Sequence, residues 1–129
     1  MEESADLLAK IEIIAQARGN YGPQAYIFVL ESLEMVLAKI EEVRHVSGED
    51  LLEEIKDLAK ERFGPLAKDV LNSWGVNCTL DFGHVVFHLV EAGLLSKTPE
   101  DSLSDFIDKY DFAQVFEVDY FDNHTPKRS

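Results

Sequence analysis

The feature that most constrains this chain is the helical spacing of its apolar residues, which recurs between short breaks rich in glycine and proline. Leucine, isoleucine and valine return every three or four residues, a spacing that places them on one face of an α-helix. The breaks fall at residues 19–23, 64–65, 75, 93 and 98–99. The pattern predicts an all-α fold, a compact helical bundle of about six helices.

The breaks also set the expected boundaries. Five regular helices are expected over residues 6–18, 23–44, 47–63, 65–74 and 80–92. A sixth, irregular segment begins at Thr98 and Pro99 and is expected to fold back on the core as two short helices. One domain is expected over residues 1–121, followed by a polar tail at 122–129 that frays.

The second helix is the expected centre of the domain. Its apolar stripe includes Tyr26, Val29 and Leu37, and its first half carries a second apolar side. The apolar run at residues 25–30 also fits a strand, because periodicity alone cannot assign so short a run.

Three local signals indicate helix ends. Ser47 and Asp50 have the spacing of a capping box at the start of the third helix. Gly75 is predicted to end the fourth helix in the left-handed conformation, and Thr79 is predicted to cap the fifth.

Charge limits the partners. The chain has 25 Asp and Glu against 12 Lys and Arg, a formal net charge of -13. Nucleic acids and anionic membranes bind through cationic side chains, so both are disfavoured, and a protein, neutral or cationic partner is expected. The start of the chain lacks the cations of a secretory signal, and no apolar run reaches the roughly 18 residues of a membrane span, so a cytoplasmic location is expected.

Helices three to five follow one another around tight turns, which is the layout of a helix-turn-helix unit. Residues 89–95 resemble the end of the recognition helix in winged-helix proteins. The expected exposed face of the fifth helix carries Asp81, His84, His88 and Glu91. Two acids and two mostly neutral imidazoles do not suit phosphate or base contacts, so a packing unit is favoured over direct DNA binding.

The same face suggests a metal site, because His84 and His88 lie four residues apart. The first histidine is not followed by the glutamate of the helical zinc-protease motif, and Asp81 and Glu91 lie about 15 Å apart along a helix. A third ligand would have to come from elsewhere, for instance His45. Two surface histidines are therefore expected, with no metal and no other cofactor.

No catalytic residue is predicted. Cys78, the single cysteine, precedes a helix start where a reactive thiol is conceivable, but no Cys-x-x-Cys partner accompanies it. A buried or half-buried structural cysteine is the preferred interpretation. The chain contains no Gly-x-Ser-x-Gly elbow, and residues 19–22 lack the ending of a phosphate-binding loop.

Aromatic residues are dense after position 105 and alternate with acids. Most are expected to fill the core, and any that cannot turn inward would form an acidic and aromatic patch for a protein partner or a second copy. The candidates for that patch are Tyr110, Phe112, Phe116, Tyr120 and Phe121.

Several separate motifs between residues 21 and 120 resemble a family of conserved bacterial proteins of unknown function. They are Ala25-Tyr26 with Phe28-Val29, Val46-Ser47-Gly48 with Leu51-Leu52, Phe63-Gly64-Pro65-Leu66-Ala67, Trp74-Gly75 followed by Thr79, Asp81-Phe82-Gly83, and Tyr110-Asp111-Phe112. The resemblance implies a bacterial source and one compact domain. It implies no activity, cofactor or catalytic residue.

The leading hypothesis from the sequence is a non-enzymatic cytoplasmic protein that acts through contacts with another protein or with itself. The first alternative is a helix-turn-helix protein related to transcription, and the second is a metal- or thiol-dependent enzyme. The choice among these three hypotheses depends on whether the acidic exterior leaves a concave pocket with reactive side chains. We expect no such pocket.

Overall fold

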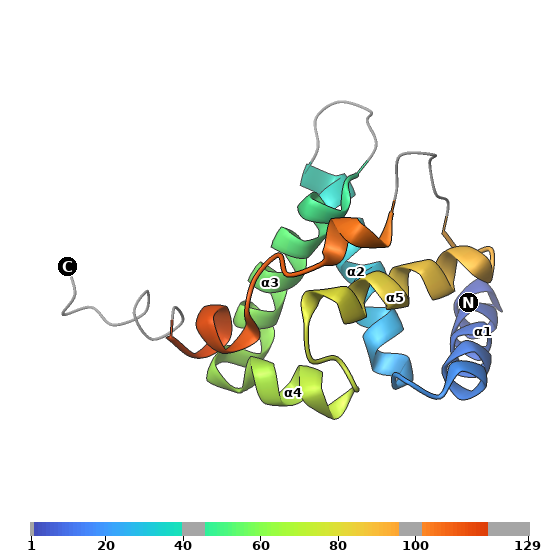
Figure 1. The fold of residues 1–129 in the computed structure, drawn as a ribbon. Coiled ribbons are helices and arrows are strands. Elements are labelled where there is room, and N and C mark those ends of the chain that lie inside the picture. The colour runs from blue at the N-terminus through green and yellow to red at the C-terminus, as the bar shows by residue number, and fades with distance from the viewer. Residues whose placement is uncertain (1, 40–45, 96–101, 119–129) are drawn as a thin grey trace.

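The computed structural model describes residues 2–39, 46–95 and 102–118, and this part of the chain consists of helices and turns without a strand (Figure 1). The five α-helices are α1 (Glu2–Arg18), α2 (Pro23–Lys39), α3 (Gly48–Phe63), α4 (Ala67–Ser73) and α5 (Thr79–Glu91). A 3₁₀ turn, η1 (Gly64–Leu66), leads into α4. A second 3₁₀ turn, η2 (Leu103–Phe106), and a π-helical turn, η3 (Gln114–Val118), form the predicted irregular segment. The predicted all-α bundle is confirmed.

Helix α2 lies at the centre, because its first half is apolar on two sides. Ala25, Tyr26, Phe28 and Val29 are fully or almost fully buried, and α2 packs against α1, α3 and α5. The run at residues 25–30 is helical, which excludes the strand alternative. The buried stripe continues through Val36, whereas Leu37 of the predicted stripe is 53% exposed.

Two of the three predicted helix ends are confirmed. The amide of Asp50 donates to Ser47 Oγ at 3.0 Å, and the amide of Ser47 donates to Asp50 Oδ2 at 3.2 Å, which completes the capping box. Gly75 has φ +92°, the left-handed conformation predicted for a helix terminator.

The predicted cap of α5 is wrong. Cys78 occupies the cap position, and Thr79 is the first helical residue and fully buried. The Thr79 hydroxyl donates to the Phe106 carbonyl and accepts from the Lys109 amide at 3.1 Å. A sequence window around Thr79 cannot reveal these partners, because they lie 27 and 30 residues away.

The C-terminal segment packs deep in the fold. Phe106 lies against Gly83 of α5, where an added β-carbon would stand 2.8 Å from the Phe106 side chain. Phe112 and Phe116 are buried, and their ring centroids lie 5.3 Å apart. The prediction that this segment folds back on the core is confirmed for residues 102–118.

Some predictions concern residues outside the described part. These are the end of the second helix near residue 44, the start of the sixth segment at Thr98 and Pro99, and the polar tail at 122–129. Within the described part, no helix combines the length and apolar character needed to cross a lipid bilayer.

Candidate functional site

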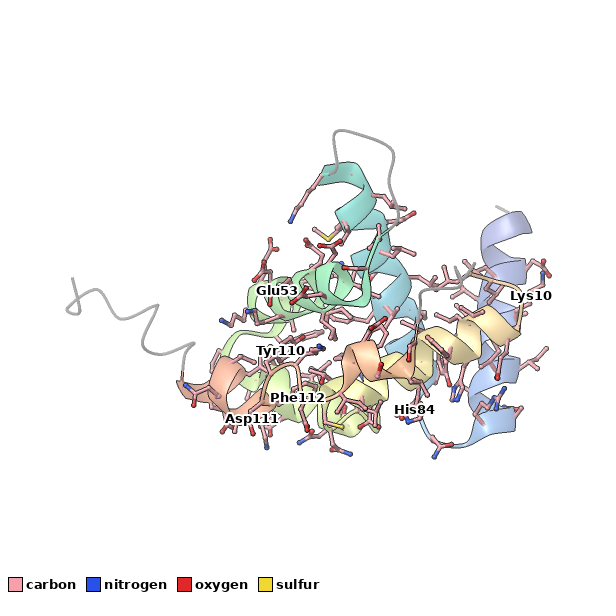
Figure 2. The ribbon with its side chains drawn as sticks, turned by 45° about the horizontal axis from the view of Figure 1, so that its top comes forward. Lys10, Glu53, His84, Tyr110, Asp111 and Phe112 are labelled. Carbon is pink, nitrogen blue, oxygen red and sulfur yellow. The ribbon has the colours of Figure 1, made fainter. Side chains whose placement is uncertain are left out.

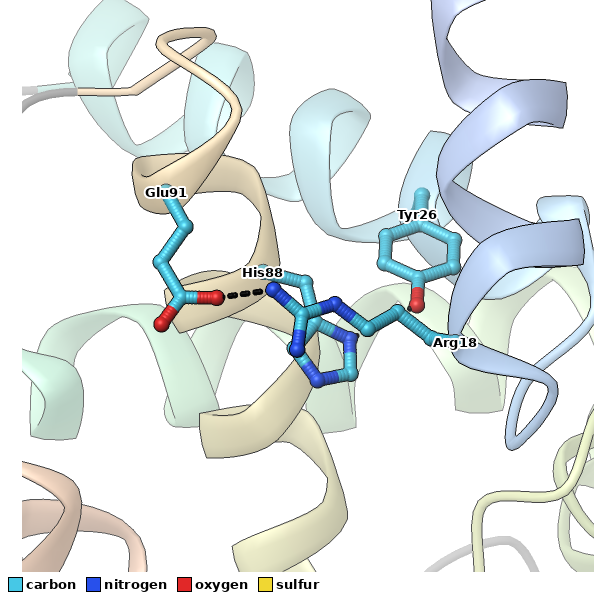
Figure 3. Close-up of polar contacts among 4 residues, drawn as sticks. All are labelled: Arg18, Tyr26, His88 and Glu91. Atoms are coloured by element: carbon cyan, nitrogen blue, oxygen red, sulfur yellow. Dashed lines mark hydrogen bonds and ion pairs between the residues drawn. The ribbon is translucent and has the colours of Figure 1, made fainter.

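Three polar contacts join α5 to the hairpin of α1 and α2. Figure 3 draws the residues of two of them, Arg18 with Glu91 and Tyr26 with His88. The Tyr21 hydroxyl donates to Asp81 Oδ1 at 2.6 Å. The Tyr26 hydroxyl lies 2.8 Å from His88 Nδ1, and Arg18 forms an ion pair with Glu91. Of the four residues predicted on the exposed face of α5, three therefore contact α1, α2 or the turn between them.

The surroundings of the Tyr26–His88 contact favour the uncharged forms of both side chains. Burial, reinforced by the Arg18 guanidinium, lowers the pKa of His88 from its usual value. Burial also raises the pKa of the Tyr26 phenol. At neutral pH the imidazole and the phenol are both uncharged, and the tautomer of the imidazole decides which of the two donates the hydrogen bond. His88 was expected to be a plain surface residue, and that expectation is wrong because His88 is half-buried and its ring stacks on the buried Tyr26 ring.

The two histidines do not assemble a metal centre with other described side chains. The rings of His84 and His88 are 6.5 Å apart between centroids, and Nδ1 of His88 is engaged by Tyr26. Over residues 2–39, 46–95 and 102–118, no group of three or more His, Cys, Asp or Glu could hold an ion. His45, the conceivable third ligand, lies outside the described residues.

Cys78 is exposed, so the prediction of a buried or half-buried cysteine is wrong. The cause is its place at the α5 cap, where the backbone is extended and the side chain points away from the core. Its thiol lies 3.6 Å from Asp81 Oδ2 and lines a hollow of about 330 Å³. The other lining residues are Asn77, Asp108, Tyr110, Asp111 and Phe112. None of these side chains is a histidine or a cation that could activate a nucleophilic thiol.

The predicted aromatic patch is not formed by its first members. Phe112 and Phe116 are buried, and the Tyr110 hydroxyl donates to the Leu52 carbonyl at 2.8 Å. Figure 2 labels Tyr110, Asp111 and Phe112 on the stretch between η2 and η3. Burial raises the pKa of Tyr110, which keeps the phenol protonated as a donor. Phe112 and Phe116 therefore belong to the core, and Tyr110 packs against it. Tyr120 and Phe121 lie outside the described residues.

An apolar groove lies between α1 and α2, and sequence reasoning missed it. Its volume is about 310 Å³. Eight aliphatic side chains and two glutamates line it: Leu7, Leu8 and Ile11 of α1, Ile27, Leu30, Glu31, Leu33, Glu34 and Leu37 of α2, and Leu94 after α5. Leu8 and Leu37 are 49% and 53% exposed, which leaves large aliphatic surfaces in contact with solvent. Leu30, Leu33 and Leu37 of the groove belong to the apolar stripe predicted for α2, and spacing alone does not show which residues of a stripe a neighbouring helix leaves open.

The two glutamates of the groove differ in their surroundings. Glu31 forms an ion pair with Arg62 of α3 at 2.6 Å. Glu34 is exposed, and among the described residues no ion pair or hydrogen bond engages its side chain. The groove thus has an aliphatic floor and one free carboxylate at its edge.

No family model, curated protein or solved structure matches this chain. The resemblance to bacterial proteins of unknown function therefore stays a prediction.

Proposed function

We propose that this chain is a non-catalytic protein that acts by binding another protein, and that the groove between α1 and α2 is its contact surface. The observation that carries the proposal is the exposure of Leu8 and Leu37 beside six further aliphatic residues in one hollow. Contiguous apolar surface is costly in water unless a partner covers it. The groove replaces the C-terminal aromatic residues as the preferred interaction site.

The alternatives have weaker support. Reading DNA with α5 would require a free face, and Asp81, His88 and Glu91 of that face contact Tyr21, Tyr26 and Arg18. A thiol-dependent enzyme would require a histidine or a cation beside Cys78 to activate its thiol, and the other residues that line the hollow at Cys78 are carboxylates, aromatic rings and an amide.

A photo-cross-linking experiment tests the proposal. Benzoylphenylalanine is placed at Leu8, at Leu37 and, as a control, at Leu66, which is 60% exposed on η1. We expect positions 8 and 37 to form an adduct with the same polypeptide in cells, and position 66 to form none. Equal adducts at all three positions, or no adduct at 8 and 37, would overturn the proposal.

A further inference from the structure

The groove has a shape and a chemistry that select among the known ways in which proteins bind peptides. We propose that the occupant of the groove is a cationic amphipathic helix of a partner protein. This inference rests on the proposed function.

The arrangement of the lining residues favours a helix. Along α2 they recur at Ile27, Leu30, Glu34 and Leu37, which is one face over about 15 Å or three turns. Helix α1 forms the other wall through Leu7, Leu8 and Ile11. A third helix laid between two neighbouring helices places its apolar stripe on both, as in the helix-in-groove mode of recognition.

The other peptide-binding modes lack what they need. An added β-strand requires a sheet edge, and the described part of the chain presents only helices and turns. Polyproline segments dock in grooves lined by aromatic residues, whereas this groove is lined by aliphatic residues and two glutamates.

The negative charge of the groove indicates which residues the polar face of the partner helix carries. Among the described residues that line the groove, Glu31 and Glu34 are the polar ones and none is a cation, and the whole chain carries a formal net charge of -13. Lysine or arginine beside the apolar stripe of a partner helix would meet the free carboxylate of Glu34, and the field of the protein would speed the encounter. A second copy of this chain would bring the same negative charge, and an anionic lipid or fatty acid would face the same two glutamates.

The test uses two synthetic peptides of about four helical turns. Both carry leucines at helical spacing, one with lysines and one with glutamates at the remaining positions. Binding to the full chain is measured by fluorescence anisotropy at low and high salt. We expect the lysine peptide to bind at least about tenfold more tightly than the glutamate peptide at low salt, and the difference to shrink at high salt.

Three variants separate docking from general charge attraction. Leu37→Asp adds a negative charge yet removes an apolar anchor, so we expect the lysine peptide to bind about tenfold more weakly. Glu34→Lys is expected to weaken binding about fivefold. Asp69→Lys makes the same charge change on α4, which contributes no residue to the groove, and is expected to leave binding nearly unchanged. Circular dichroism checks that each variant is folded, and none of the three positions is buried.

The possible results of these experiments test two proposals separately: the class of partner, and binding in the groove itself. Equal binding of both peptides would overturn the cationic helix while leaving groove docking in place. Tighter binding by Leu37→Asp would overturn the inference, because it would show non-specific attraction. A fluorescent fatty acid that binds in the groove when neither peptide does, or a dimer that Leu37→Asp dissociates, would also overturn it. Loss of the cross-links at positions 8 and 37 would remove the proposed function itself.

Discussion

Helix α1 and the C-terminal segment flank the same core in opposite ways. Helix α1 is regular and 17 residues long, yet among its described side chains the buried apolar ones are Ile11, Ile14 and Ala15. The C-terminal segment consists of short 3₁₀ and π turns, yet it buries Phe106, Phe112, Val115 and Phe116. Regular secondary structure therefore does not mark where this fold is most tightly packed. The loosely covered side is where the groove leaves aliphatic side chains exposed.

The largest expected loss of stability comes from a substitution in the tightly packed C-terminal segment. Phe116 is completely buried, so Phe116→Ala should lower the free energy of unfolding by about 4 kcal/mol. Leu7→Ala on α1, where the residue is 37% exposed, should cost well under half of that. Urea unfolding of both variants measures the contrast. Equal losses would show that α1 is packed as tightly as the C-terminal segment.

The contact between Gly83 and Phe106 is the next test. Gly83→Ala would force the Phe106 side chain away from α5, which should cost about 2 kcal/mol. Gly93→Ala is the control, because a β-carbon there meets nothing within 4 Å and the cost, about 1 kcal/mol, comes from its φ of +80°. The midpoints of thermal unfolding should rank in that order. The reverse ranking would argue against close packing of η2 on α5.

Thr79 joins the C-terminal segment to α5 through its hydroxyl. Thr79→Val keeps the volume but leaves the Phe106 carbonyl and the Lys109 amide without that partner, which should cost about 2 kcal/mol. Ser73→Ala removes an exposed hydroxyl that donates to the Val70 carbonyl, and it should change stability by no more than about 0.5 kcal/mol. Chemical denaturation compares the two, and equal losses would count against the role given to Thr79.

A smaller effect concerns pH on the side of α1. The folded pKa of His88 is lowered, so the unfolded state binds its proton more readily. This contribution to stability is fully present above about pH 6.5, the unfolded pKa, and is lost as pH falls through the folded pKa. His88→Gln should remove that part of the pH dependence, and His84→Gln serves as the control. Unfolding curves between pH 7 and 5 that are the same for wild type and His88→Gln would contradict the neutral Tyr26–His88 contact.

The smallest expected effect on stability falls in the groove. Leu8→Asn should change the free energy of unfolding by less than about 0.5 kcal/mol, because the side chain is half exposed. The same variant should weaken partner binding, which separates a docking residue from a core residue. A large loss of stability in urea would instead assign Leu8 to the core.

Sequence reasoning succeeded where the cause of a feature is local. Ser47 and Asp50 cap α3 across three residues, and Gly75 ends a helix through its own φ angle. These features need no knowledge of distant partners. The ends of α1 at Arg18 and of α3 at Phe63, and the central place of α2, followed from spacing in the same way.

It failed where the cause is a contact between distant residues. Thr79 is turned inward by Phe106 and Lys109, and His88 packs on Tyr26, 62 residues earlier in the chain. The groove was missed for the same reason. Leucines at helical spacing look alike in sequence, whether a neighbouring helix covers them, as for Leu52, or leaves them open, as for Leu37.

The central claim is that the groove between α1 and α2 receives the partner, and methyl NMR tests it most directly. The full chain, labelled at leucine, isoleucine and valine methyl groups, is titrated with the lysine peptide. We predict that shifts concentrate at Leu8, Ile11, Leu30 and Leu37, with little change at Leu71, Val85 and Leu89 of the closed core. Shifts spread evenly over the molecule, or confined to residues outside the groove, would contradict the account.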